Sequence, residues 1–451
     1  MAFEGVLYNL ENEQQFWDEL DEIVSTRCSD HERIDDALRS YLSFTTEFRA
    51  EYLSTEDDIT KCSRRLIEGD LFANHKDYVR RQIVYCILQE DDNPTLHLVA
   101  TFLLVDGSNH DATFEMMQAE GAFSRLVELV QRPEVEADMD LHQLLLKLLY
   151  EMSRIQKLSW DDLVAVDDAF VLRLFQIIEG ASYDVDDPYH YPVIRVLLVL
   201  NEQYMIASTS SATVSPPPRV TNRVIKALST HGLSYKTFGE NIILLLNRES
   251  ELSLQLLILK LLFLIFQSSS TAEYFYTNDL HVLIDVILRN LLDLPYDEPR
   301  AESLRHTYLR VLHPLLANSQ VSRPPHYKRT DILRLLNMLA TSGTHFAPID
   351  DTTLRLVKRC TTVPWLQEAG NPSRSNSYSD AEGGASAPLT PLSGSHENNA
   401  IGEGQRELAR RMLGMSVKAG NESATSVVAV AAHTARPGIQ TPSKVRDAQE
   451  D

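Results

Sequence analysis

The side chains that could carry out chemistry are few and scattered in this chain of 451 residues. The segment 186–190, with the sequence DDPYH, contains carboxylates and an imidazole, which are donor types that bind divalent metals. His306 and His313 are seven positions apart, a spacing that can place both on one face of a helix. Neither pattern is accompanied by a second group of ligands. We therefore favour a polar loop between helices for the first and solvated or core-edge histidines for the second.

Known motifs of catalysis and nucleotide binding are absent from the sequence. It contains no G-x-S-x-G, Walker A, GxGxxG or HExxH pattern. The four cysteines are far apart and form no CxxC, which argues against zinc and against a disulfide framework and suits a reducing compartment. We therefore expect no catalytic, cofactor-binding or metal site, and we do not expect an enzyme.

A leucine-rich phrase recurs along the chain at near-constant spacing. The steps between phrases are about 47, 50, 63 and 50 residues, close to the period of armadillo or HEAT repeats. Stacked helices of this kind form a long rigid surface for a partner. The phrases are LVATFLLVD (98–106), LLLKLLYEM (144–152), VLLVLNEQYM (196–205), LILKLLFLIF (257–266) and LRVLHPLLA (309–317).

Helical spacing of apolar residues extends through most of the chain, and no strand alternation is sustained. Ser54 or Thr55 is a plausible N-cap, Pro94 suits the first turn of a helix and Gly107 suits a C-terminal stop. We expect helices over 16–24, 33–53, 56–69, 77–91, 94–107, 112–130 with a break at Gly121, 141–155, 162–180, 191–208, 223–232, 237–250, 252–266, 271–295, 302–320, 327–340 and 351–360.

The composition changes near residue 367, where Ser, Gly, Ala, Pro and Asn become frequent and aromatic residues almost disappear. Such a segment cannot bury enough apolar surface to fold. We therefore predict an all-α, armadillo/HEAT-like helical-repeat solenoid over residues 1–366 and a disordered tail over residues 367–451.

Charge is unevenly distributed on a chain whose formal net charge is −22. Residues 285–360 contain 11 Lys and Arg against 8 acids, a net of +3. This excess could bind an acidic protein surface, but it is too small and has too few interleaved aromatics to indicate nucleic-acid binding.

The apolar stretch 252–266 is too short and too polar to span a bilayer, and the first residues do not form a signal peptide. We therefore expect a cytoplasmic protein without membrane insertion.

The tail contains short patterns typical of regulation. Ser377 has an arginine three residues before it, and Thr390 and Thr441 each precede a proline, so all three are candidate phosphorylation sites. The segment 388–391, PLTP, is a minimal PxxP ligand for a Src-homology-3 protein, although it lacks a flanking basic residue at ligand spacing.

Several phrases resemble the leucine-rich domain of the SPIN/WISH/DIP family, including its fungal low-dye-binding endocytic branch. They are DYVRRQIVYCILQEDDNPTLHLVATFLLVDG (77–107), ATFEMMQAEGAF (112–123), VLLVLNEQYM (196–205), FYTNDLHVLIDVILRNLLDLP (275–295) and LRHTYLRVLHPLLANSQ (304–320). The resemblance covers about residues 50–366. The animal members' N-terminal Src-homology-3 domain is not expected here, because the chain starts directly with helices.

The resemblance implies an armadillo-repeat protein that binds and activates the actin-related protein 2/3 complex without a preformed filament. The product would be an unbranched seed filament, used at cortical actin patches during endocytosis. The alternative is a generic helical-repeat adaptor with another partner. From charge alone, we expect the basic C-terminal helices to contact an acidic partner, with the helix at 257–266 as the rival site; the candidate residues are Arg305, Arg310, Lys328, Arg329 and Arg334.

Overall fold

The computed structural model describes residues 10–180, 187, 190–209, 220–295, 298–341 and 349–367. Most of the DDPYH segment and the tail lie outside these residues. The tail includes the PxxP segment and the candidate phosphorylation sites Ser377, Thr390 and Thr441, so the roles of these segments stay predictions.

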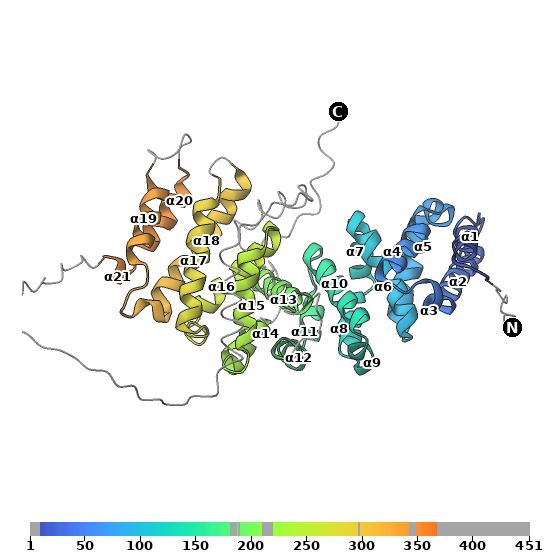
Figure 1. Cartoon of the computed structure of the whole chain (residues 1–451), viewed down its shortest axis with the longest axis horizontal. Coiled ribbons are helices and arrows are strands. Elements are labelled where there is room, and N and C mark those ends of the chain that lie inside the picture. The colour runs from blue at the N-terminus through green and yellow to red at the C-terminus, as the bar shows by residue number, and fades with distance from the viewer. Residues whose placement is uncertain are drawn as a thin grey trace, which may run out of the picture.

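The described residues are helical and contain no strand, which confirms the predicted all-α solenoid. The helices follow one another in chain order, from α1 at the right of Figure 1 to α21 at the left. The first third of the chain forms α1 (Glu13–Val24), α2 (His31–Glu47), α3 (Arg49–Tyr52), α4 (Glu56–Glu68), α5 (Asp70–Gln89), α6 (Asn93–Asn109) and α7 (Asp111–Ala119). The middle forms α8 (Ala122–Val130), α9 (Pro133–Ala137), α10 (Met139–Ile155), α11 (Trp160–Ala165), α12 (Asp168–Glu179), α13 (Tyr191–Thr209) and α14 (Arg223–His231). The C-terminal part forms α15 (Lys236–Arg248), α16 (Leu252–Gln267), α17 (Thr277–Asp293), α18 (Pro299–Asn318), the 3-10 helix η1 (Gln320–Ser322), α19 (Arg329–Ala340), α20 (Asp351–Thr361) and α21 (Pro364–Gln367).

The five leucine-rich phrases form one continuous row of stacked helices, which we call the leucine-rich row: α6, α10, α13, α16 and α18. Each member packs against the next, and α20 packs on α18 at the end of the row. Helix α16 is apolar on nearly all sides, and Leu254, Ile258 and Leu262 in it are fully buried. A helix of this kind needs neighbours on both flanks, which the stack supplies. The repeat in the sequence therefore marks the interior of the solenoid.

Local sequence signals place several of the helix ends. Thr55 caps α4 in a capping box, because its hydroxyl accepts from the amide of Asp58 while the Asp58 carboxylate accepts from the amide of Thr55. Gly121 has a φ of 78°, and it separates α7 from α8 as the predicted break requires.

Other boundaries differ from the expectation. Gly107 does not stop α6, which continues to Asn109. A Cβ at Gly107 would lie 2.4 Å from the ring of Phe114, so glycine lets α7 pack closely.

The expected helix over 33–53 is divided at Phe48, whose ring packs near those of Phe16 and Phe44. The expected helix over 162–180 is divided as well, because Asp167 caps a new helix by accepting from the amide of Phe170. Helix α17 begins at Thr277 and not at residue 271.

Among the described residues, no helix combines the length and apolar character that crossing a bilayer requires.

Candidate partner-binding surface

The five predicted basic residues do not form one cluster. Arg305 is only 3% exposed, and its Nη2 donates to the carbonyl of Pro295 at 2.6 Å. Arg329 is half-buried and donates to the carbonyls of Trp365 and Leu366 at 2.9 and 2.8 Å. Both guanidinium groups bind backbone carbonyls within the chain. Arg305 and Arg329 therefore hold the C-terminal helices together and are not part of an exposed basic surface.

Lys328 and Arg334 line a groove between α17 and α19. The ammonium of Lys328 lies 2.7 Å from Asp285, and the guanidinium of Arg334 lies 3.0 Å from Asp331. The groove has a volume of about 330 Å³, and its wall includes Leu292, whose surface is 48% exposed. The remaining lining residues are Leu288, Arg289, Asp293, Leu335 and Met338. Because acids and bases alternate in its wall, the groove is nearly neutral and amphipathic.

Arg310 lies elsewhere, where α18 packs against α20. Burial, followed by the positive charge of Arg355, lowers the pKa of Arg310. In the same way burial and Arg359 lower the pKa of His313. These groups are brought together because α18 packs on α20. We call Arg310, His313, Arg355 and Arg359 the basic ridge.

The basic ridge carries positive charge that the described residues do not neutralise. No acid lies within ion-pairing distance of Arg310, Arg355 or Arg359 among the described residues, whereas most other arginines of the solenoid have such a partner. Arg359 and the neighbouring Lys358 also lie in the last turn of α20, where positive charge favours the helix dipole. The helix dipole accounts for these two residues but not for Arg310 and Arg355.

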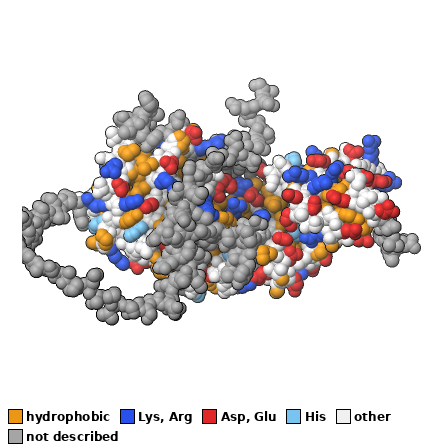
Figure 2. Space-filling model, viewed as in Figure 1, with side chains coloured by type: hydrophobic (Ala, Val, Ile, Leu, Met, Phe, Trp, Pro, Cys, Tyr) orange, Lys and Arg blue, Asp and Glu red, His pale blue; other side chains and the backbone are white. Residues whose placement is uncertain are grey.

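One face of the molecule shows which side chains gather at its two ends. In Figure 2, acidic and basic side chains are interspersed at the right-hand end, where α1 to α7 lie. At the left-hand end, over the C-terminal helices, hydrophobic side chains lie among basic and acidic ones. This combination is typical of protein-binding surfaces, where Arg and apolar residues are enriched.

The sequence pointed to Arg310 but not to its neighbours in space. Arg355 and Arg359 are four positions apart and so share one face of α20, which is the only signal the sequence offers. That α20 lies beside α18 cannot be read from spacing, because the two helices are separated by η1, α19 and their connections.

The two histidines considered in the sequence have different surroundings. His313 is half-buried and belongs to the basic ridge. His306 is only 5% exposed and lies 2.9 Å from the carboxylate of Asp350, which precedes α20. His306 is therefore a contact between α18 and the start of α20.

The fold and this surface define a leucine-rich helical-repeat protein that presents a charged face at its C-terminal end. Residues 186–332 match the family described as SPIN90/Ldb17, leucine-rich domain. Protein dip1 of Schizosaccharomyces pombe is 31% identical over 372 residues, covering 82% of this chain and 98% of that protein. Protein LDB17 of Saccharomyces cerevisiae is 28% identical over 473 residues, covering 91% of this chain and 92% of that protein. The chain belongs to the SPIN90/Ldb17 family, as the resemblance in the sequence indicated.

Similarity to solved structures is more distant. The crystal structure of one engineered protein aligns with 76% of this chain, and the alignment covers 82% of the engineered protein. The TM-score is 0.36 and the sequence identity is 13%.

Proposed function

We propose that this protein binds the actin-related protein 2/3 complex and activates it without a preformed filament. The product would be an unbranched seed filament, and its assembly would take place in the cytoplasm at cortical actin patches during endocytosis. Membership of the SPIN90/Ldb17 family supports the proposal, since family relatives match nearly the whole described solenoid.

The observation that carries the proposal is the unneutralised basic ridge on a chain of net charge −22. An otherwise acidic protein repels acidic partners except where it concentrates positive charge. We therefore expect an acidic partner surface to approach the ridge, since electrostatic complementarity of this kind orients docking partners and raises the association rate.

The leucine-rich row supplies the rigidity that activation needs. An activator shifts its partner between two arrangements only by binding one arrangement more tightly than the other. A preformed surface on buried, stacked helices loses little conformational entropy on binding, so more of the contact energy remains for this discrimination.

We also propose that the protein is not a catalyst. The groove between α17 and α19 is open and lined by paired acids and bases with leucines, without a nucleophile beside a base. Such a groove is suited to holding part of a partner. An adaptor with a non-actin partner would also use these surfaces, so the test must read out filament assembly.

The test is a pyrenyl-actin assembly assay with the purified protein and the actin-related protein 2/3 complex, without preformed filaments and without a Wiskott–Aldrich-type activator. We expect faster assembly, with unbranched filaments in parallel images. Reactions without the complex, or without this protein, should stay slow. No acceleration and no binding to the complex would rule out the proposal and leave an adaptor with another partner.

A further inference from the structure

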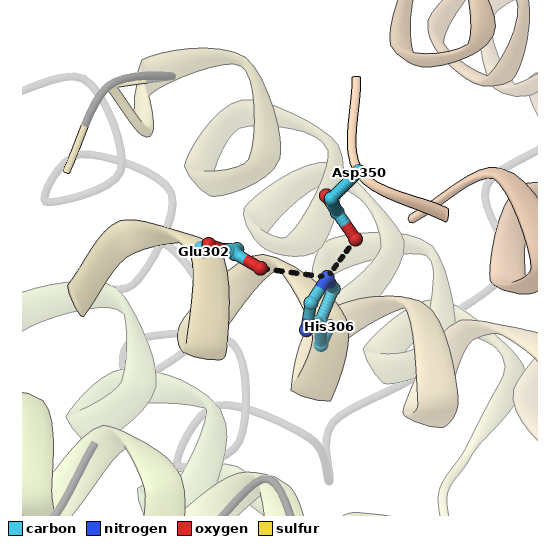
Figure 3. Close-up of side chains that lie close together, drawn as sticks. All are labelled: Glu302, His306 and Asp350. Carbon is cyan, nitrogen blue, oxygen red and sulfur yellow. Dashed lines mark hydrogen bonds and ion pairs between the residues drawn. The ribbon is translucent and has the colours of Figure 1, made fainter. Parts of the chain in front are cut away.

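Glu302, His306 and Asp350 meet where α18 packs against the start of α20 (Figure 3). The Nε2 atom of His306 lies 2.9 Å from a carboxylate oxygen of Asp350 and 3.8 Å from one of Glu302. The three donor atoms all lie within 4.8 Å of one another. They come from one turn of α18 and from the residue that precedes α20, so the cluster joins two helices.

The 2.9 Å contact between His306 and Asp350 has the length of an ordinary hydrogen bond, and small side-chain rotations would bring the three donor atoms to the separations of a metal site. A tetrahedral site with bonds of about 2.0–2.2 Å separates its donor atoms by about 3.3–3.6 Å. The two distances from His306 Nε2 lie on either side of that range. At 3.8 Å Glu302 is too far away to accept a hydrogen bond, yet its side chain is 45% exposed and can rotate inward.

The charge of the cluster also favours a cation. Neither Glu302 nor Asp350 pairs with a Lys or Arg among the described residues. The Asp350 carboxylate accepts a hydrogen bond from the amide of Thr353 at 2.7 Å, in addition to its contact with His306. Two carboxylates thus face a single ring nitrogen, which also lies 3.1 Å from the hydroxyl of Thr353 and can offer one proton to only one of these partners. A divalent cation would neutralise both.

The donor set indicates the kind of cation. One imidazole and two carboxylates suit first-row transition metals such as Zn²⁺, whereas Mg²⁺ and Ca²⁺ prefer sites made only of oxygen. Glu302 and His306 are four positions apart on one helix, which is a spacing that brings both donors to the same side. The partial exposure of Glu302 and Asp350 provides a path for the ion and for a water ligand.

We propose that Glu302, His306 and Asp350 bind a divalent transition-metal cation of the Zn²⁺ class, with water completing the coordination, and that the ion links α18 to the start of α20. The imidazole binds through Nε2 in its neutral form. Because the same two helices carry the basic ridge, the bound ion would fix the spacing between Arg310 and Arg355. The metal site does not depend on the actin proposal, and it is tested without actin.

The test is calorimetric titration of the metal-free full-length protein with Zn²⁺, repeated with Mg²⁺. We expect one Zn²⁺ site that Mg²⁺ does not fill, and Co²⁺ should give the visible absorption of a low-symmetry site. The key variant is Glu302→Gln, because the residue is exposed enough to change without harming the fold. Replacing a residue that only hydrogen-bonds to a metal ligand typically lowers metal affinity by about 10–100-fold. Losing a direct ligand such as Glu302 should lower the affinity for Zn²⁺ at least as much.

Two further variants make the result specific. His306→Gln should weaken binding as well, while Asp351→Asn removes an exposed carboxylate next to the cluster without removing a ligand, so it should bind like the unmodified protein. Zn²⁺ should also raise the melting temperature of the unmodified protein but not that of Glu302→Gln. Equal affinity in Glu302→Gln and the unmodified protein, or no Zn²⁺ site at all, would overturn the proposal and leave a proton shared between His306 and Asp350.

Discussion

The guanidinium of Arg80 donates two hydrogen bonds to the carboxylate of Asp106, at 2.6 Å from Nε and 3.0 Å from Nη2. The two side chains are 5% and 0% exposed, so the pair lies inside the solenoid and joins α5 to α6. The hydroxyl of Thr113, in α7, donates to the same carboxylate. One buried acid thus connects three successive helices next to the first leucine-rich phrase.

Breaking this pair should destabilise the protein strongly. In Arg80→Ala, the Asp106 carboxylate stays buried without its cation, and the free energy of unfolding should fall by about 3–5 kcal/mol. The measurement is urea unfolding followed by circular dichroism. Arg323→Ala is the matched control, since its ion pair with Glu273 is exposed and worth about 0–1 kcal/mol. An equal fall in the free energy of unfolding in both variants would show that the buried Arg80–Asp106 pair stabilises the protein no more than the exposed Arg323–Glu273 pair does.

Gly107→Ala should also be destabilising, although alanine favours helices over glycine by about 1 kcal/mol. The new Cβ would meet the ring of Phe114 at 2.4 Å, and such overpacking typically costs about 1–3 kcal/mol. Adding Phe114→Leu removes the clash, so the double variant should lose less stability than the two single losses combined. Strict additivity in the unfolding measurements would mean that Gly107 and Phe114 do not constrain each other.

Reversing charge on the basic ridge should weaken binding to the actin-related protein 2/3 complex. In a variant with Arg355→Glu and Arg359→Glu, association should slow by about tenfold or more, and the effect should shrink as salt is added. Binding kinetics on immobilised complex provide the measurement.

The control for the ridge variant changes charge by the same amount at the other end of the solenoid. Arg33→Glu with Arg39→Glu alters two exposed arginines of α2, whose side chains are 68% and 64% exposed. If this control slowed association as much as the ridge variant does, net charge and not the ridge would control binding.

His142 should make stability depend on pH. Burial lowers the pKa of His142, even though Glu136 acts in the opposite direction. The folded protein therefore binds this proton less readily than the unfolded chain does. The neutral imidazole thus contributes fully to the free energy of unfolding at neutral pH, and this contribution is lost as pH falls below the unfolded pKa of about 6.5.

In His142→Asn the position no longer titrates. Between about pH 7.5 and pH 5.5, the melting temperature should fall less for the variant than for the unmodified protein. An identical fall in both would assign the pH dependence to other groups.

The sequence predicted the elements well and their contacts poorly. The leucine-rich phrases identified the buried row because every position of such a helix must be covered. Gly107 was misinterpreted, because a glycine near a helix end can serve either as a stop or as a place for close packing, and only the position of Phe114 distinguishes them.

The candidate sites depend on contacts between helices that are distant in the chain. Arg310 was identified by its charge, whereas its relation to Arg355 follows from α18 packing on α20. His306 was considered together with His313, but the structure gives it Glu302 and Asp350 as neighbours. The spacing between Glu302 and His306 was visible in the sequence; the third donor was not, since Asp350 lies beyond α19.

The stacking of the leucine-rich row has a mechanical consequence. Its contacts run from each helix to the next, α6 to α10, α10 to α13, α13 to α16 and α16 to α18. A small rotation at one junction therefore leaves the others intact, while rotations at successive junctions add along the row. The protein should behave as an elastic rod whose stiffness is the combined stiffness of these junctions. A partner that attaches near both ends and fits a different curvature would bend that rod, and the work of bending would be stored as strain in the junctions between the two points of attachment.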